Sequence, residues 1–497
     1  MRGLIKYSKS IFKKMKANLK VILWLFAATI IFTTSCRKSE SVSSTQNLVS
    51  NHGHDVVYGW NELFLIIDRD ANGFRPGPGP KALAYIGLAA YETAVPGMPS
   101  FKSIKNIWGS ELKIPNFDNN QEIHWPTALN ASYYYMFKKY FEKTEFVSGA
   151  GHLTRDDVHR LIENLNTKNE TEYAAEINSV VFNNSKAWGQ SVASAVQAWA
   201  KTDPGYEGEL NPLNNDPSKP MYYDFKKEFY DANGNLKRPG MWQPTNDNPD
   251  AGMFPRWGET RTFATSNEQK LCKAPIPYSN DPKSPYYAQV LEVYNSCNRS
   301  MPYEWRWMAE FWSDDITGLT FSPPSRLLAI MDQILVLKSS NLEKAVEGAV
   351  KMGLALNDFG VACWHSKWHW KVERPENFIK REIDPNWEPL LVNPINGSIG
   401  ITPAFPAYPS GHSTFGGGGA TILADLFGNN TRFTDNCHKD RSEFIGTPRT
   451  FNSFKQAGGE DAFSRVYLGV HFRMDCETAI EFGENIAIRV LELPWKK

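Results

Sequence analysis

The chain has 497 residues, of which 41% are hydrophobic and 22% are charged, proportions typical of a globular protein. Lysine plus arginine and aspartate plus glutamate both number 54, so the formal net charge is zero and the protein as a whole does not attract nucleic acid. A chain of this length holds two or three ordinary domains, or one large domain with insertions. Any local cluster of positive charge in so neutral a chain therefore indicates a specific role.

Residues 1–36 have the pattern of a targeting segment. The basic stretch MRGLIKYSKSIFKKMKANLK, in which Met15 is a second candidate start, precedes the apolar run VILWLFAATIIF and the small residues TTS. This apolar run is too short for a comfortable membrane span and suits the central region of a signal peptide. Cys36, which follows directly, resembles the lipidated cysteine of bacterial lipoprotein signals. An uncleaved signal anchor is the alternative interpretation.

The segment after Cys36 predicts how the folded protein is connected to its membrane anchor. Residues 37–54 are polar and predict a flexible tether. We therefore expect a protein that is lipid-anchored at the bacterial cell envelope, on the outer membrane, and that faces the periplasm or the cell surface.

Five further cysteines follow, none of them in the C-x-x-C spacing of zinc or thioredoxin-like sites. Disulfides between Cys272 and Cys297 or between Cys437 and Cys476 are compatible with an extracytoplasmic location, and the sequence does not choose between them. The odd count leaves at least one thiol unpaired.

Most of the remaining periodic segments predict helix, because apolar residues recur three and four positions apart. The expected helices span 80–95, 125–143, 170–201, 284–297, 325–340, 341–372, 413–427 and 461–493. Alternating strand patterns are scarce. The predicted fold class is therefore all-α, a helical bundle with long irregular loops.

Composition suggests a division of the chain into two regions. We expect an N-terminal helical region over 55–300 and a C-terminal helical region, which carries the chemistry, over 301–497. Inside the first region, residues 203–281 are rich in proline, glycine, asparagine and aromatic residues. This texture predicts an ordered but irregular loop that packs on the helical body.

Two short blocks of the C-terminal region suit an anion. KWHWKVERP (367–375) places Lys367 and Arg374 seven residues apart, about two helical turns, so that both can point at one anion, and Pro375 is expected to end the helix. PSGH (409–412) offers a hydroxyl, a backbone N–H and a titratable ring at an expected helix start, where unpaired N–H groups favour negative charge.

The third block, SRVYLGVHFRMD (464–475), contains Arg465, His471 and Asp475. The four-residue step from His471 places Asp475 beside it on a helix, where a carboxylate fixes the tautomer of the ring. Taken singly, the blocks have ordinary interpretations: a solvated face, a capped helix start and a surface ion pair. Taken together, they predict one pocket for a tetrahedral or trigonal-bipyramidal oxyanion.

The three blocks, K-x6-RP, PSGH and SR-x5-H-x3-D, resemble the signature of the phosphatidic acid phosphatase type 2 superfamily, which unites acid phosphatases with vanadium-dependent haloperoxidases. The flanking segments PAFPAYPSGHSTFGG and EDAFSRVYLGVHFRMD are similar to the chloroperoxidase-type vanadium enzymes. Ser413 stands where such enzymes often have alanine, and its hydroxyl can bias hydrogen bonding near His412. The resemblance implies two packed helical bundles.

The resemblance also implies a cofactor, vanadate, whose site phosphate can share. His471 would be the only protein ligand of the metal, with Asp475 behind it, and His412 would act as acid and base. The groups that would bind the oxygens are Lys367, Arg374, Arg465, Ser410 and the N–H of Gly411. Lys367 would also take part in catalysis.

Three further residues take roles from the resemblance. Trp364 and Phe405 correspond to aromatic residues of the halide pocket, with simple core packing as the alternative. FWSDD (311–315) resembles a stretch whose last aspartate orients an active-site arginine, so Asp315 is expected to pair with Arg465.

The predicted function is a vanadate-dependent haloperoxidase that oxidises halide with hydrogen peroxide to hypohalous acid. The alternative is an acid phosphatase in which His471 is the nucleophile, through a phosphohistidine, and His412 is the leaving-group acid. A third hypothesis is a surface lipoprotein that binds glycans without catalysis. No nucleic acid partner is expected. Members of this family often pair, so a homodimer is an expectation, although the sequence shows no self-association surface.

Overall fold

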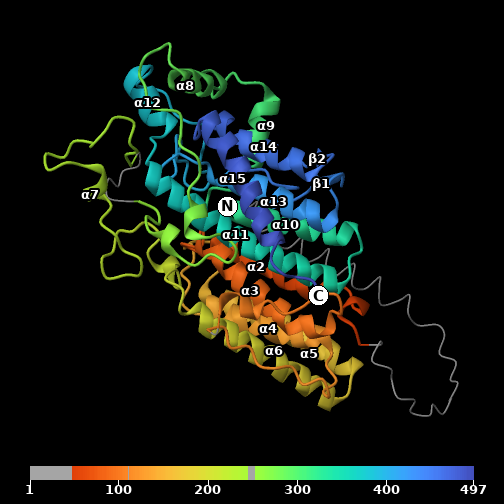
Figure 1. Ribbon diagram of the computed structural model, residues 1–497. Helices are drawn as coiled ribbons and strands as arrows, with labels where there is room; N and C mark the ends of the chain where they lie inside the picture. The colour runs from red at the N-terminus through yellow and green to blue at the C-terminus, as the bar shows by residue number, and fades with distance from the viewer. Residues whose placement is uncertain (1–46, 110, 245–251) are drawn as a thin grey trace, which may run out of the picture. The chain divides into compact units, whose positions relative to one another are not determined.

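The computed structural model describes residues 47–109, 111–244 and 252–497, and this part of the chain contains fourteen α-helices and one two-stranded sheet (Figure 1). The predicted all-α fold class is confirmed. The predicted signal peptide, Cys36 and most of the predicted tether lie outside the described residues. The last part of that tether, residues 47–54, is ordered: Val49 is buried in the 3-10 helix η2 (Val49–Asn51), and Gly53 forms a bridge with Asn341.

The first group of helices comes from the N-terminal half. Its members are α2 (Asp55–Asp70), α3 (Pro78–Ala94), α4 (Trp125–Tyr140), α5 (Arg155–Glu176) and α6 (Ser179–Ala200). The prediction of one helix over 170–201 was wrong, because the chain breaks at Ile177 and the side chain of Asn178 caps a new helix by accepting from the N–H groups of Val180 and Val181.

The second group comes from the C-terminal half. Its members are α8 (Pro285–Ser296), α9 (Tyr303–Phe311), α10 (Pro323–Leu337), α11 (Leu342–Trp370), α12 (Pro375–Glu382), α13 (Gly411–Phe427), α14 (Phe454–Tyr467) and α15 (Arg473–Leu491), with the strands β1 (Phe433–Asp435) and β2 (Arg449–Phe451) paired antiparallel. The expected helix over 461–493 is two helices, because Gly469 adopts a φ of 85° between α14 and α15.

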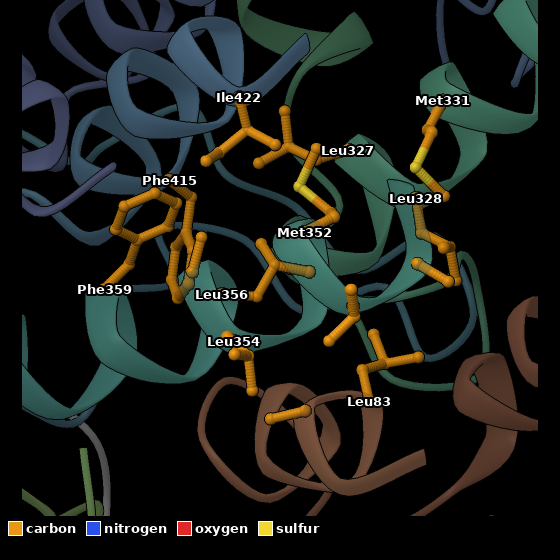
Figure 2. Packing of buried hydrophobic residues seen from close by; sticks show 14 of the residues in the cluster. Leu83, Leu327, Leu328, Met331, Met352, Leu354, Leu356, Phe359, Phe415 and Ile422 are labelled. Atoms are coloured by element: carbon orange, nitrogen blue, oxygen red, sulfur yellow. The ribbon is translucent and has the colours of Figure 1, made fainter. Parts of the chain in front are cut away.

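Helix α11 joins the two groups, since it packs on α3 and also on α13 and α15. A Cβ added to Gly87 of α3 would lie 2.7 Å from the carbonyl oxygen of Ala349 on α11, so these two backbones touch. Figure 2 shows apolar side chains of α3, α10, α11 and α13 meeting around α11. Each fully buried leucine or phenylalanine there contributes about 1.5–3 kcal/mol.

The glycine run of α13 serves close packing on α15. A Cβ on Gly417 would lie 2.8 Å from the carbonyl oxygen of Ile480, and a Cβ on Gly483 would collide with the carbonyl oxygen of Thr414. Side chains at these positions would push the helices apart. The contact fixes the start of α13, which carries the PSGH block, against the segment that precedes α15.

The irregular segment over 203–281, as far as it is described, packs on α11 through aromatic residues. It contains α7 (Lys226–Phe229) and the 3-10 helices η5 (Gly208–Leu210), η6 (Trp257–Glu259) and η7 (Asn267–Lys270). Its Phe225 and Trp242 rings contact Trp368 of α11 at centroid distances of 5.2 and 5.7 Å. The remaining 3-10 helices are η3 (Val95–Gly97) and η4 (Lys105–Trp108).

All five cysteines after Cys36 are free thiols, so neither of the two candidate disulfides forms. Among the described helices, none combines the length and the apolar composition that a membrane crossing requires.

Candidate active site

The three sequence blocks meet at one place in the fold. Lys367 lies in the last turn of α11, and the chain then turns at Lys371, which has a φ of 56°. Arg374 is the N-cap residue of α12, so the expectation that Pro375 ends a helix was wrong: Pro375 begins the next one. Lys367 and Arg374 therefore approach the site from two elements, not from one helical face.

A cavity of about 130 Å³ lies where the blocks meet. Its wall includes the predicted site residues Trp364, Phe405, Gly411, His412, Arg465, His471 and Asp315. Arg374 borders the cavity through its hydrogen bond to His471. The structure thus brings together residues that lie more than a hundred positions apart in the chain.

The tautomer of His471 is set by its two neighbours. Its Nδ1 lies 2.9 Å from Oδ2 of Asp475, a carboxylate that can only accept, and Arg374 Nη1 donates to its Nε2 over 3.0 Å. The proton is therefore on Nδ1 and the lone pair is on Nε2. The expected His471–Asp475 contact exists, but not on one helix, because His471 precedes α15 and Asp475 lies in its first turn.

Burial and then the charge of Arg374 hold the pKa of His471 well below its usual value, so the ring is neutral. Burial raises the pKa of Asp475. The backbone N–H of Phe472, which donates to Asp475 Oδ2 over 3.0 Å, lowers this pKa and so opposes the effect of burial. A neutral imidazole with its lone pair on Nε2 is the form that binds a metal, and here that lone pair accepts from Arg374 Nη1.

Two arginines present unpaired N–H groups at the site. Arg374 donates from Nε to the Phe405 carbonyl (3.0 Å) and from Nη1 to the Val470 carbonyl (2.8 Å), which leaves Nη2 without a partner. In Arg465, Nη2 binds Asp315, and both Nε and Nη1 have no partner. Burial lowers the pKa of Arg374 to about 9, so it remains charged at neutral pH.

Lys367 is fully buried, and its ammonium donates to the carbonyl oxygens of Pro406 (3.0 Å) and Ala407 (2.8 Å). The nitrogen also lies 5.0 Å from the centre of the Phe405 ring. Burial lowers the pKa of Lys367. Since an ammonium has three N–H bonds, one remains for a ligand.

His412 has the opposite tautomer to His471. Its Nε2 lies 2.9 Å from the carbonyl oxygen of Ser313, which only accepts, so the proton is on Nε2 and the lone pair is on Nδ1. Burial and then the positive charge of Arg465 lower the pKa of His412 to about 4. At neutral pH the ring is therefore uncharged, with its lone pair on Nδ1.

Ser410 is the N-cap residue of α13 and is fully buried. Its Oγ accepts from the backbone N–H (3.3 Å) and the hydroxyl (2.8 Å) of Ser413. Because those bonds use the acceptor side of Ser410, its own proton is free for a ligand. The extra hydroxyl of Ser413 thus forms its hydrogen bond with Ser410 and not with His412. The backbone N–H of Gly411, in the first turn of α13, has no acceptor within the helix.

The segment 313–315 positions two site residues at once. Asp315 binds Arg465 Nη2 at 2.9 and 3.1 Å, as expected, and the Ser313 carbonyl holds His412. Between them, Asp314 has a φ of 43° and binds Arg326 (3.0 Å) and His438 (2.7 Å). Sequence reasoning did not find this buried anchor, because Arg326 and His438 lie in segments without a motif.

Trp364 and Phe405 form an apolar wall of the cavity. Their ring centres are 4.8 Å apart, and Trp364 donates from Nε1 to the Met253 carbonyl over 3.1 Å. The guanidinium of Arg374 lies 4.8 Å from the Phe405 ring centre, so the aromatic wall also covers a cation.

Part of the wall was not predicted. Arg75, Pro76, Met253, Pro323, Leu391, Ile401, Pro403, Phe415 and Ile316 complete it. Arg75 and Met253 come from the N-terminal region, so the cavity is not built by residues 301–497 alone. Arg75 donates to the carbonyl oxygens of Asp314 (3.1 Å) and Thr320 (2.8 Å), and its only sequence signal is a cation in the proline-rich turn RPGPGP.

Comparisons with known proteins agree with this geometry. A family model described as the VCPO second helical-bundle domain matches residues 349–494. The chain is similar to a vanadium chloroperoxidase of Curvularia inaequalis, at 27% identity over 283 residues that cover 45% of this chain and 46% of that protein. A solved structure described as the first bacterial vanadium-dependent iodoperoxidase superposes with a TM-score of 0.69 and 25% identity, and the match covers 88% of this chain and 94% of that one.

Residues 349–494 thus match a vanadium haloperoxidase domain, and the fold of the described chain is similar to that of bacterial vanadium-dependent haloperoxidases. A vanadium-dependent bromoperoxidase of Ascophyllum nodosum is 33% identical over 99 residues, 18% of each chain. A bacterial vanadium-dependent chloroperoxidase at 14% identity, with a TM-score of 0.61 and coverage of 85% of this chain and 92% of its own, supports the fold. The aligned chain spans less than half the length of these curated relatives.

Proposed function

We propose that this protein is a vanadate-dependent haloperoxidase that oxidises halide with hydrogen peroxide to hypohalous acid. One observation carries the proposal: Arg465 and His471 line one cavity, Arg374 binds His471 Nε2, and both arginines keep buried N–H groups without a partner. Buried donors without acceptors are costly in a folded protein, and a bound oxyanion would satisfy them.

The donor set fits vanadate. Vanadate combines several negatively charged oxygens, which suit N–H donors, with a metal centre that accepts an imidazole nitrogen. The side chains of Lys367, Arg374, Arg465 and Ser410, with the N–H of Gly411, would hold the oxygens, and His471 Nε2 would hold the metal. Asp475 would keep His471 in the required tautomer.

Bound vanadate would supply a Lewis-acidic centre that activates hydrogen peroxide without changing its own oxidation state. His412 would take a proton from hydrogen peroxide at Nδ1, which its low pKa leaves free at neutral pH. Lys367 would direct an N–H toward the oxygen that carries developing negative charge. In sum, one halide ion, one hydrogen peroxide and one proton give one hypohalous acid and one water.

The apolar wall favours this reaction over phosphate-ester hydrolysis. Trp364 and the half-buried Phe405 face the cavity with carbon surface, which suits a polarisable, weakly hydrated anion such as a halide. A site that binds neutral glycans without catalysis does not require buried arginine side chains with unpaired N–H groups.

The decisive experiment is a paired assay on purified protein. Halide oxidation with hydrogen peroxide is measured for chloride, bromide and iodide before and after vanadate loading, beside hydrolysis of p-nitrophenyl phosphate. We expect halide oxidation only with vanadate, and competition by phosphate. His369→Ala, at an exposed position in the last turn of α11, serves as the control and should match the unmodified protein. Ester hydrolysis without halide oxidation after loading would assign the phosphatase function instead.

We further infer from the sequence pattern of residues 1–54 that the protein is anchored through lipid on Cys36 at the cell envelope. Labelling of cells with a palmitate analogue, followed by membrane fractionation, should show label on the protein, and Cys36→Ala should abolish it. Light scattering on the purified protein tests the expected homodimer.

A further inference from the structure

A second cavity, of about 350 Å³, adjoins the proposed active site. The two cavities share Asp315, Ile316 and Leu391 in their walls, so they are direct neighbours. The second cavity reaches the size of ligand pockets, about 300–1,000 Å³, whereas the first does not. A molecule too large for the site of halide oxidation can therefore lie beside it.

The second cavity is mostly apolar. Its carbon surface comes from Ile316, Leu319, Leu390, Leu391, Val392, Pro394, Phe444, Ile445 and Leu468. Exposed apolar side chains extend along the same loop, since Val392, Ile395 and Ile399 are 45%, 48% and 60% exposed. Such surface is unfavourable in water unless a ligand covers it.

The carboxylates in this cavity already have partners within the protein. Glu310 accepts from Arg306 (2.7 Å) and from the backbone N–H of Ile445 (2.8 Å), and Glu443 accepts from Arg441 at 3.1 Å. Asp315 is paired with Arg465, and Asp314 is paired with Arg326 and His438. Because these charges are compensated, the cavity suits a neutral ligand and not an ion.

We propose that this cavity binds the organic acceptor of the halogen: a neutral, apolar molecule with an electron-rich ring or alkene. The proposal rests on the proposed haloperoxidase function. Hypohalous acid formed in the first cavity transfers its halogen to carbon: the carbon–halogen bond forms and the oxygen–halogen bond breaks. On a ring the hydroxide leaves with the C–H proton as water, and on an alkene it bonds to the neighbouring carbon. An acceptor bound one cavity away meets the reagent before it diffuses into solvent.

Binding is tested first, without vanadate, so that the result does not depend on halide oxidation. The probe is N-phenyl-1-naphthylamine, a neutral amine with three aromatic rings whose fluorescence rises in apolar surroundings. Val392→Trp fills the cavity from an exposed position, and Ile399→Trp, on the same loop but outside the cavity wall, is the matched control. We expect Val392→Trp to weaken binding about tenfold or more and Ile399→Trp to leave it unchanged. Equal binding in all three proteins would overturn the proposal.

The second test compares two acceptors in one reaction. The vanadate-loaded enzyme halogenates a mixture of 2-naphthol and a small polar phenol, and the product ratio is compared with that given by added hypohalous acid. We expect the enzyme to favour 2-naphthol several-fold over the reagent ratio, Val392→Trp to return to the reagent ratio, and Ile399→Trp to keep the preference.

The outcomes of the two tests are distinct. An enzyme that oxidises halide but gives the reagent ratio refutes the acceptor site alone. A protein that binds the naphthylamine in a Val392-dependent way but oxidises no halide refutes the proposed function, and with it the acceptor role of the cavity.

Discussion

The two walls of the small cavity differ in chemistry but share their supports. The cationic wall is formed by Arg465 and His471, with Arg374 behind His471, and the apolar wall by Trp364 and Phe405. The two are linked, because Arg374 donates to the Phe405 carbonyl and lies over its ring. Under the proposed function, the cationic wall would hold the oxyanion and the apolar wall would exclude water and select the halide, and substitutions can separate these two tasks.

The cationic wall depends most on His471. His471→Ala should abolish vanadate binding and lower halide oxidation by more than about a thousandfold, because it removes the only proposed metal ligand. Vanadium NMR with a titration of protein measures the binding directly. His369→Ala is the control, and retention of bound vanadate in His471→Ala would show that the cations alone hold the oxyanion.

The same wall should weaken when its support is removed. Asp315→Asn leaves the shape but loses the charge that holds Arg465 Nη2, so we expect vanadate affinity to fall about 10–100-fold. Arg465→Gln and the double variant complete a mutant cycle. If Asp315 acts through Arg465, the losses of vanadate affinity in the two single variants do not add up in the double variant. Full additivity would mean that Asp315 affects vanadate binding independently of Arg465.

The cationic wall was also the more predictable of the two from sequence. Its residues lie in two compact blocks with fixed spacing, and such short-range patterns can be read from a sequence even when the local geometry is predicted wrongly. Arg374 caps a helix where Pro375 was expected to end one, and His471 lies ahead of its helix, yet His471 lines the cavity and Arg374 binds it. The fold class was predictable for the same reason, because the spacing of apolar residues within a helix is also a short-range pattern.

What the sequence could not supply were contacts between distant segments. The anchor of Asp314 by Arg326 and His438, and the wall contributed by Arg75 and Met253, arise only when the two helical groups pack around α11. Apolar periodicity predicts that a helix is buried, but not which neighbour buries it. The breaks at Ile177 and Gly469 were missed because apolar residues continue across them.

Substitutions in the apolar wall should change halide preference, whereas substitutions in the cationic wall should change vanadate binding. Phe405→His and Trp364→Ser place polar atoms where the halide would lie, so we expect a several-fold change in the ratio of kcat/KM between iodide and bromide with vanadate still bound. Phe405→Leu and Trp364→Phe are matched apolar controls. A collapse of vanadate affinity in both polar variants would instead identify these rings as structural supports of Arg374 and Lys367.

The last expected effect is on the stability of the folded protein, and it concerns His412, which also lines the cavity. Its pKa of about 4 in the folded chain is below the usual 6.5, so the unfolded chain takes up a proton first as the pH falls. The stability of the vanadate-free protein should therefore be complete above pH 6.5 and fall by about 3 kcal/mol between pH 6.5 and 4 through this residue.

Urea unfolding of the unmodified protein and of His412→Gln across this range isolates that contribution, because His471, whose pKa is also lowered, is present in both. Added phosphate should reduce the difference in pH-dependent stability between the two proteins, since an anion beside His412 favours its protonated form and raises its pKa. An identical pH dependence in the two proteins would mean that His412 is already solvated, and that the apolar wall does not keep water from the cations.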